Sequence, residues 1–130
     1  MTDIDSFFEM LKEVCDELPD EFFRELHHGV QLAEEAKISP HARADDLVVM
    51  GEYHRSYLGN KITIYYGSFV RTCSHLSSDQ LKDRLREVVR HEFRHHMENL
   101  AGMYGRDSLE HEDREELRRY LRSGQTPVKR

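Results

Sequence analysis

The sequence has no long hydrophobic run. Nowhere among its 130 residues is there an apolar stretch of about 18 residues, which is the length that a membrane-spanning helix requires. Residues 1–5 are acidic, and no basic segment followed by an apolar core opens the chain, so a secretory signal is not indicated. We therefore expect a cytoplasmic protein that has no membrane partner.

The chain also has few cysteines and no excess of positive charge. The two cysteines, Cys15 and Cys73, lie far apart without C-x-x-C spacing, which favours free buried thiols over a disulfide or a cysteine-based zinc site. The net charge is −6, and acidic and basic residues are interspersed along the chain. This distribution suits a soluble surface and argues against a nucleic-acid partner.

The length of 130 residues predicts one domain with a single core. We place this domain at residues 1–122 and expect the tail at 123–130, which contains Gly, Pro and terminal basic residues, to be disordered.

The first half of the chain reads as a helix followed by strands. Apolar residues recur at three and four positions from Ile4 to Leu18, which predicts an amphipathic helix closed by Pro19. Asp20 should cap a short helical turn that Gly29 ends. The pattern then becomes typical of strands at residues 30–32, 47–50 and 61–66.

The second half is predicted to be helical. A turn of helix at Phe69–Cys73 precedes a capping box formed by Ser77 and Gln80, which should open a long helix reaching about Leu100. A last helix can be capped by Asp107 or Ser108. The fold class we predict is therefore α+β: a short β-sheet packed beside a long active-site helix, with N- and C-terminal helices.

The long helix contains the pattern H-E-x-x-H at residues 91–95. Residues four apart share a helix face, so the imidazoles of His91 and His95 can converge on one cation while Glu92 accepts a proton from water beside them. However, the chain has nine histidines, and a shuffled chain of this composition would show the pattern about one time in fifteen. The motif therefore needs structural support.

The position of Glu92 supplies some of that support. Steps of 100° per residue place Glu92 within the apolar face of the helix, with His91 and His95 along the edge of that face. A buried carboxylate is costly unless it is paired or lies near a cation, and a metal would satisfy it. A hydrogen bond from a histidine or a tyrosine hydroxyl is the alternative. The other residues on the apolar face are Leu81, Leu85, Val88 and His96.

A third metal ligand can come from residues 110–113, which read Glu-His-Glu-Asp on the first turn of the last predicted helix. A bend at Gly102 and Gly105 followed by an antiparallel helix would return this turn to His95, where an acid would complete a His-His-carboxylate site. Alternatively, these acids are ordinary N-terminal residues that favour the helix dipole.

Four segments resemble the small bacterial zincin-like metallopeptidases, and the likeness extends over nearly the whole chain. The segments are Leu18–Phe23, Gly51–Tyr53, Ile62–Gly67 and His91–His96, whose doubled histidine is the most specific part. The resemblance implies a minimal zincin with peptidase activity, in which the edge strand of a small sheet receives an extended peptide.

This chain departs from the family pattern H-E-x-x-H-x-x-G-x-x-D, because Met97–Ala101 precede the first glycine, Gly102. The acidic ligand is therefore displaced. Matching the acidic turn of the family to residues 112–115 favours Asp113, with Glu112 next and His111 third.

We predict a zinc-dependent metallopeptidase that hydrolyses a peptide or protein substrate. Zn²⁺ would be held by His91, His95 and Asp113, while Glu92 would serve as general base and then as proton donor to the leaving amine. The alternative is a non-catalytic binding or adaptor module with the same fold that holds zinc structurally or holds none. The small chain favours this alternative, since it leaves little material for specificity pockets or a lid.

Overall fold

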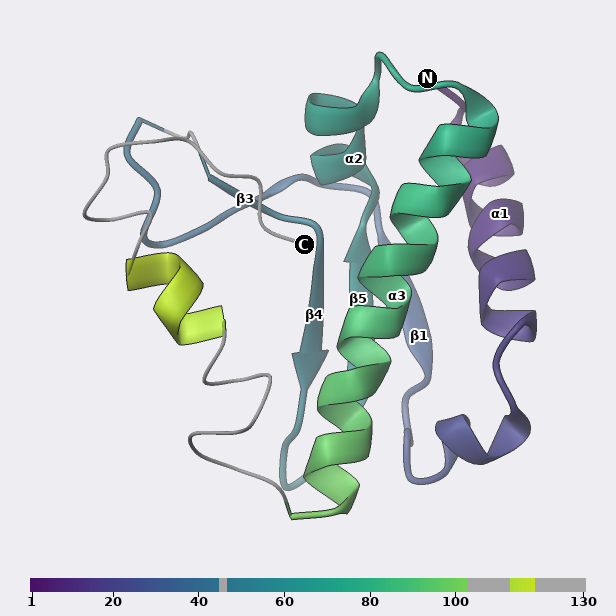
Figure 1. Ribbon diagram of the computed structural model, residues 1–130, viewed down its shortest axis with the longest axis vertical. Helices are drawn as coiled ribbons and strands as arrows, with labels where there is room; N and C mark the ends of the chain where they lie inside the picture. Colours follow the sequence, from purple (N-terminus) through teal and green to yellow (C-terminus); the bar gives the residue numbers. More distant parts are fainter. Residues whose placement is uncertain (45–46, 103–112, 119–130) are drawn as a thin grey trace.

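The computed structural model describes residues 1–44, 47–102 and 113–118 (Figure 1). The elements in chain order are α1 (Ile4–Asp16), the 3₁₀ helix η1 (Asp20–Phe23), β1 (Val30–Ala33), β2 (Lys37–Ile38), β3 (Val48–Val49), β4 (Gly51–His54), β5 (Lys61–Tyr65), α2 (Tyr66–Cys73) and α3 (Ser78–Leu100). Residues 113–118 are also helical. The predicted α+β class is confirmed, whereas the caps at Asp107 and Ser108 and the disordered tail at 123–130 lie outside the described residues.

The main sheet has three strands in the order β1-β5-β4. β1 runs parallel to β5 with Val30 opposite Ile62, and β4 runs antiparallel to β5 with Gly51 opposite Ile64. The central strand is the most apolar, and the side chains of Ile62 and Ile64 are fully buried. β4 is therefore an edge strand of this sheet. A separate pair, β2 and β3, is antiparallel.

Helix α3 packs on β4, β5 and α1. The predicted capping box opens it: Gln80 N donates to Ser77 Oγ at 3.2 Å, and Ser77 N donates to Gln80 Oε1 at 3.0 Å. The apolar face predicted from the 100° steps is also confirmed, because its members are at most 2% exposed. They are Leu81, Leu85, Val88, Glu92 and His96.

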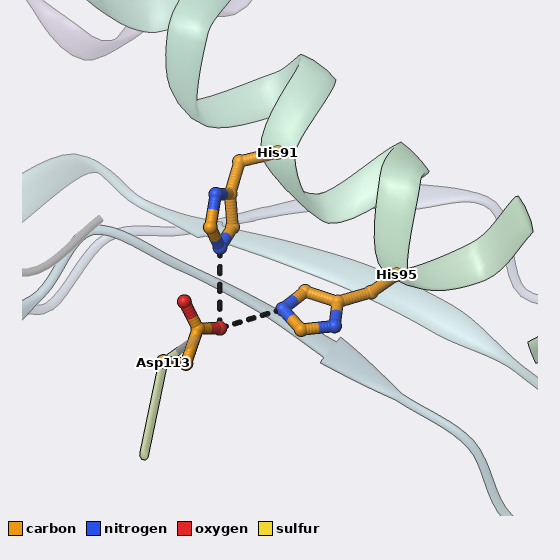
Figure 2. Close-up of side chains that lie close together, drawn as sticks. All are labelled: His91, His95 and Asp113. Carbon is orange, nitrogen blue, oxygen red and sulfur yellow. Dashed lines mark hydrogen bonds and ion pairs between the residues drawn. The ribbon is translucent and has the colours of Figure 1, made fainter. Parts of the chain in front are cut away.

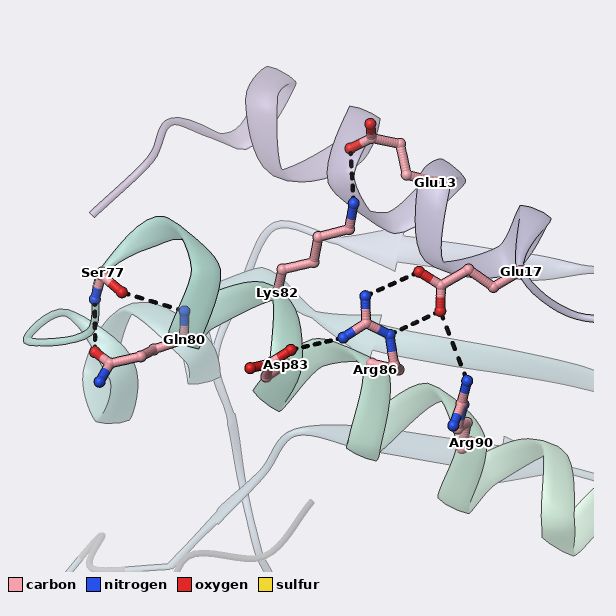
Figure 3. A network of polar contacts seen from close by, with 8 residues as sticks. All are labelled: Glu13, Glu17, Ser77, Gln80, Lys82, Asp83, Arg86 and Arg90. Carbon is pink, nitrogen blue, oxygen red and sulfur yellow. Dashed lines mark hydrogen bonds and ion pairs between the residues drawn. The ribbon is translucent and has the colours of Figure 1, made fainter.

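Ion pairs tie α3 to α1 (Figure 3). Arg86 donates to Asp83, three residues earlier on the same helix, at 2.6 Å, and it also donates two hydrogen bonds of 2.7 and 2.9 Å to Glu17, just after α1. These hydrogen bonds from Arg86 lower the pKa of Glu17. Lys82 lies 3.6 Å from Glu13 on the same side. The side of α3 that carries Lys82 and Arg86 therefore packs against α1 and the residue that follows it.

The sequence did not predict β2 and β4 as strands. Each is short and polar, and its extended form depends on a partner distant in the sequence, which local pattern does not report. The predicted cap at Asp20 is wrong, because Pro19 occupies the N-cap of η1 and no side chain caps it. Cys15 and Cys73 are free, as expected, and Cys73 is buried, whereas Cys15 is only partly buried. Among the helices that the structure describes, none combines the length and apolar character that crossing a bilayer demands.

Candidate metal centre

Three side chains that the sequence placed in one site converge in the structure (Figure 2). His91 and His95 project from α3 and direct their Nε2 atoms at Asp113, whose Oδ2 lies 3.2 and 2.8 Å from them respectively. The three ligand atoms lie within 4.8 Å of one another. The side chains are 15–20% exposed, so the cluster is sheltered but accessible.

The donor set fits zinc. Two imidazole nitrogens and one carboxylate oxygen are the protein ligands of many catalytic zinc sites, which keep a fourth position open. Ligands about 2.0–2.2 Å from zinc in a tetrahedron lie roughly 3.3–3.5 Å apart. The distances of 3.2 and 2.8 Å from Asp113 Oδ2 to the two Nε2 atoms are close to this spacing, so a cation could be accommodated by small side-chain movements.

Asp113 reaches the cluster from the first of the helical residues 113–118, in the second half of the chain. In Figure 1 these residues lie on the β4 side of the sheet, away from α1. The structure thus brings the acid favoured by the sequence to the two histidines across a separation of 18 residues from His95. Glu112 and His111, the other two candidates, lie outside the described residues.

Glu92 is 2% exposed, which confirms its predicted burial in the apolar face of α3. It follows His91 directly, so it is turned by about 100° around the helix from that ligand. Its side chain packs against Gly51 of β4, on the sheet side of the helix. Glu92 is therefore next to a candidate ligand in the sequence, and it is not among the three residues whose ligand atoms converge.

His96 has a different role from the histidine beside it. Its side chain is fully buried, with Nδ1 2.7 Å from Tyr53 Oη and Nε2 2.7 Å from the carbonyl oxygen of Arg24. Both ring nitrogens are therefore engaged by the protein, and His96 does not join the metal cluster. Neither Tyr53 nor Arg24 was predicted as a site residue from the sequence. A period of two in Gly51-x-Tyr53, which turns both residues to the same face of β4, is the signal that could have found Tyr53.

The opposite face of β4 carries a second polar cluster around Glu52. Lys37 Nζ donates to both carboxylate oxygens at 2.7 and 2.8 Å, and Tyr65 Oη donates to one of them at 2.6 Å. Burial alone would raise the pKa of Glu52, but these hydrogen bonds and the charges of Lys37 and His54 outweigh it and lower the pKa. For His54, burial is the main effect and lowers the pKa. These contacts stabilise the face of β4 that points away from α3.

The fold and the cluster together define a small α+β domain with a His-His-carboxylate centre on its longest helix. A family model described as zincin-like metallopeptidase matches residues 46–116, and the chain belongs to this family. A solved structure, a conserved hypothetical protein from Thermus thermophilus, is similar with 31% sequence identity and a TM-score of 0.67, covering 78% of this chain and all of that one. No curated protein matches the sequence significantly.

Proposed function

We propose that the protein is a zinc metallopeptidase whose metal is held by His91, His95 and Asp113 and whose general base is Glu92. One observation carries the proposal: two imidazole nitrogens and a carboxylate oxygen converge within 4.8 Å of one another, and the residue that follows His91 is a glutamate that is only 2% exposed. The family to which the chain belongs supports the same chemistry.

When bound, zinc would act as a Lewis acid that polarises the scissile carbonyl and makes a water molecule more acidic. Glu92 would accept a proton from the attacking water and pass it to the leaving amine. Its buried position on the sheet side of α3 would fix the direction of this transfer, and the same burial would limit access of bulk water to the carboxylate. His91 and His95, one helical turn apart, would fix the metal relative to that base.

The edge strand β4 supports a peptide or protein as the substrate. Tyr65 N donates to Met50 O at 3.0 Å, so in the antiparallel ladder residues 50, 52 and 54 direct their backbone groups toward β5, and Gly51 and Tyr53 direct theirs to the other edge. Within the described part of the chain, no strand pairs with β4 on that edge. An extended peptide could add there as a further strand and bring its backbone past Glu92.

The substitution Glu92→Gln tests the proposal, because the amide is nearly isosteric but cannot accept the proton. We expect the variant to keep its fold and its zinc, yet to lose about 10²-fold or more of its turnover on any peptide that the wild type cleaves. The assay is cleavage of a broad peptide library, run beside thermal melts and zinc analysis of both proteins.

The rival, a non-catalytic module, predicts a different outcome. If Glu92 only satisfies a buried partner, Gln would take over part of that hydrogen bonding, and the main effect would be a stability change of about 1–3 kcal/mol. A zinc-loaded wild type that cleaves nothing in the library, or a Glu92→Gln protein that cleaves as fast as the wild type, would reject the enzyme.

A further inference from the structure

We propose that His96 and Tyr53 are positioning residues that hold the edge strand β4 in register with the metal helix, so that a peptide added to β4 lies correctly across the metal centre. The inference rests on the proposed function but concerns residues outside the metal cluster. His96 is buried and Tyr53 is partly buried, and in the proposed mechanism neither residue binds the metal or moves the catalytic proton.

The hydrogen bonds at His96 fix which ring nitrogen carries the proton. The carbonyl of Arg24 can only accept, so Nε2 donates to it over 2.7 Å. Nδ1 is then left to accept from the hydroxyl of Tyr53 over 2.7 Å, and this hydroxyl in turn accepts from Asn99 Nδ2 over 3.0 Å. The two rings also pack with centroids 5.2 Å apart. His96 thus links β4, α3 and the segment after η1 through one side chain.

The carbonyl that receives His96 is itself held in a strained turn. Glu25, the next residue, has a positive φ of 58°, a conformation that costs energy for a residue with a side chain. Its own carbonyl accepts from Asn60 Nδ2 at 3.1 Å, which ties this turn to the β4–β5 loop. The consecutive carbonyls of Arg24 and Glu25 therefore accept hydrogen bonds from two different segments, His96 on α3 and Asn60 in the β4–β5 loop. These contacts hold in place the carbonyl to which His96 donates.

The spacing of these contacts explains the doubled histidine of the motif. Each candidate metal ligand on α3 is followed directly by a residue that meets β4: Glu92 after His91 meets Gly51, and His96 after His95 meets Tyr53. The four residues from Glu92 to His96 advance about 6 Å along the helix, and the two residues from Gly51 to Tyr53 advance about 6.7 Å along the strand. The two contacts are therefore separated by nearly the same distance on both elements. A one-residue slip of β4 would turn Gly51 and Tyr53 away from α3.

The two contacts between α3 and β4 differ in kind. The Glu92–Gly51 contact involves packing of the side chain on the strand, whereas His96–Tyr53 includes a directional hydrogen bond. Gly51 and Tyr53 are also the residues whose backbone groups are directed to the outer edge of β4. Loss of the His96–Tyr53 bond should therefore weaken peptide docking along this edge while the ligand atoms of His91 and His95 stay in place.

The experiment separates peptide docking from metal binding by using two hydroxamates on zinc-loaded protein. Acetohydroxamate reports on the metal alone, and tetra-alanine hydroxamate adds a backbone that can pair with β4. The ratio of the two affinities, measured by calorimetry, therefore gives the contribution of the edge strand without requiring turnover.

Tyr53→Phe and His96→Gln both remove the bond between these two residues, although Gln can still donate to Arg24 O. We expect each to lower the affinity ratio about tenfold and to leave zinc content and acetohydroxamate affinity within about twofold of wild type. His96→Asn places an acceptor near the position of Nδ1 and should restore most of the ratio. The matched control is Tyr66→Phe on α2, which removes a tyrosine hydrogen bond of 2.7 Å to Thr2 O and should leave the ratio unchanged.

The outcomes separate the two proposals. If the affinity ratio is unchanged in Tyr53→Phe and His96→Gln, even with a lower melting temperature, Tyr53 and His96 only stabilise the fold, and the inference is overturned. A wild type that binds zinc and acetohydroxamate but gains nothing from the tetra-alanine extension would overturn it as well, while leaving the metal site intact. A wild type that binds no zinc would instead reject the proposed function, and the inference with it. If Tyr53→Phe does not fold, the comparison of His96→Gln with His96→Asn decides.

Discussion

Glu92 packs where Gly51 has no side chain. A Cβ atom built on Gly51 would lie 3.3 Å from Glu92 Cγ, 2.9 Å from Val88 Cγ1 and 3.1 Å from Ile64 Cδ1. The first and last of these are tight, and the contact with Val88 is closer than van der Waals packing allows. The missing side chain on the edge strand therefore permits the close approach of α3 that places the candidate base on the sheet.

Gly51→Ala should push β4 and α3 apart. Because three buried side chains must give way at once, we expect a loss of about 1–3 kcal/mol in the free energy of unfolding, measured by urea denaturation. The control is Gly29→Ala, where no atom beyond the adjacent residues lies within 4 Å of the new Cβ and the penalty, about 1 kcal/mol, comes from the positive φ of 66°. If Gly51→Ala proves as stable as the wild type, the close approach is not required.

Asp113→Ala should weaken zinc binding at least 10-fold, since it removes one of three protein ligands from the centre. Competition with a chromophoric chelator measures this affinity. Glu116→Ala is the matched control, because it removes an exposed acid from the same helical stretch and should change the affinity far less. Glu112→Ala checks the register of the family match. Should Glu112→Ala weaken binding more than Asp113→Ala, the assignment of the third ligand is wrong by one residue.

The Glu52 cluster should give the protein a measurable acid sensitivity. The pKa of Glu52 is lower in the folded protein, so its ionised form stabilises the fold. That contribution is complete above the ordinary Glu pKa of about 4.3 and is lost as the pH falls through the lower folded-state pKa. Glu52→Gln should therefore cost about 1 kcal/mol at pH 7 and progressively less as the pH falls below about 4.3.

Urea denaturation of wild type and Glu52→Gln across this pH range measures the difference. Glu9→Gln, which breaks an exposed pair of 2.9 Å with Lys12, should change the free energy of unfolding little at any of these pH values. A Glu52→Gln difference that stays constant or grows toward acid pH would contradict the assignment.

The helices and the motif could be predicted because their signals are local. The capping box at Ser77 and the three-and-four spacing of apolar residues locate α3, and the 100° rule alone puts Glu92 and His96 on its buried face. Asp113 was predicted from the resemblance to the acidic turn of the family, because the residues alone did not decide which acid in 110–113 is the third ligand.

The pairings that build the site could not be predicted, because they depend on tertiary contacts. Apart from the two-residue spacing of Gly51 and Tyr53, no local pattern near Glu52 indicates a strand, and the extended form of this polar segment depends on its pairing with β5. Glu17, the partner of Arg86 beside α1, lies 69 residues away in the sequence, so local pattern could not indicate this contact, unlike the contact with Asp83 three residues away. The acceptor of His96 Nε2 is the backbone carbonyl of Arg24. Every residue has a backbone carbonyl, so the residue type at position 24 could not indicate this contact.

The most direct test of the metal centre is X-ray absorption at the zinc edge on protein loaded with one equivalent of zinc. We expect two imidazole nitrogens and one carboxylate oxygen at about 2.0–2.2 Å, with one position left to water or buffer. His91→Ala and His95→Ala should each abolish this spectrum, whereas His96→Ala should preserve it. A spectrum without imidazole ligands, or one that survives both His91→Ala and His95→Ala, would contradict the site.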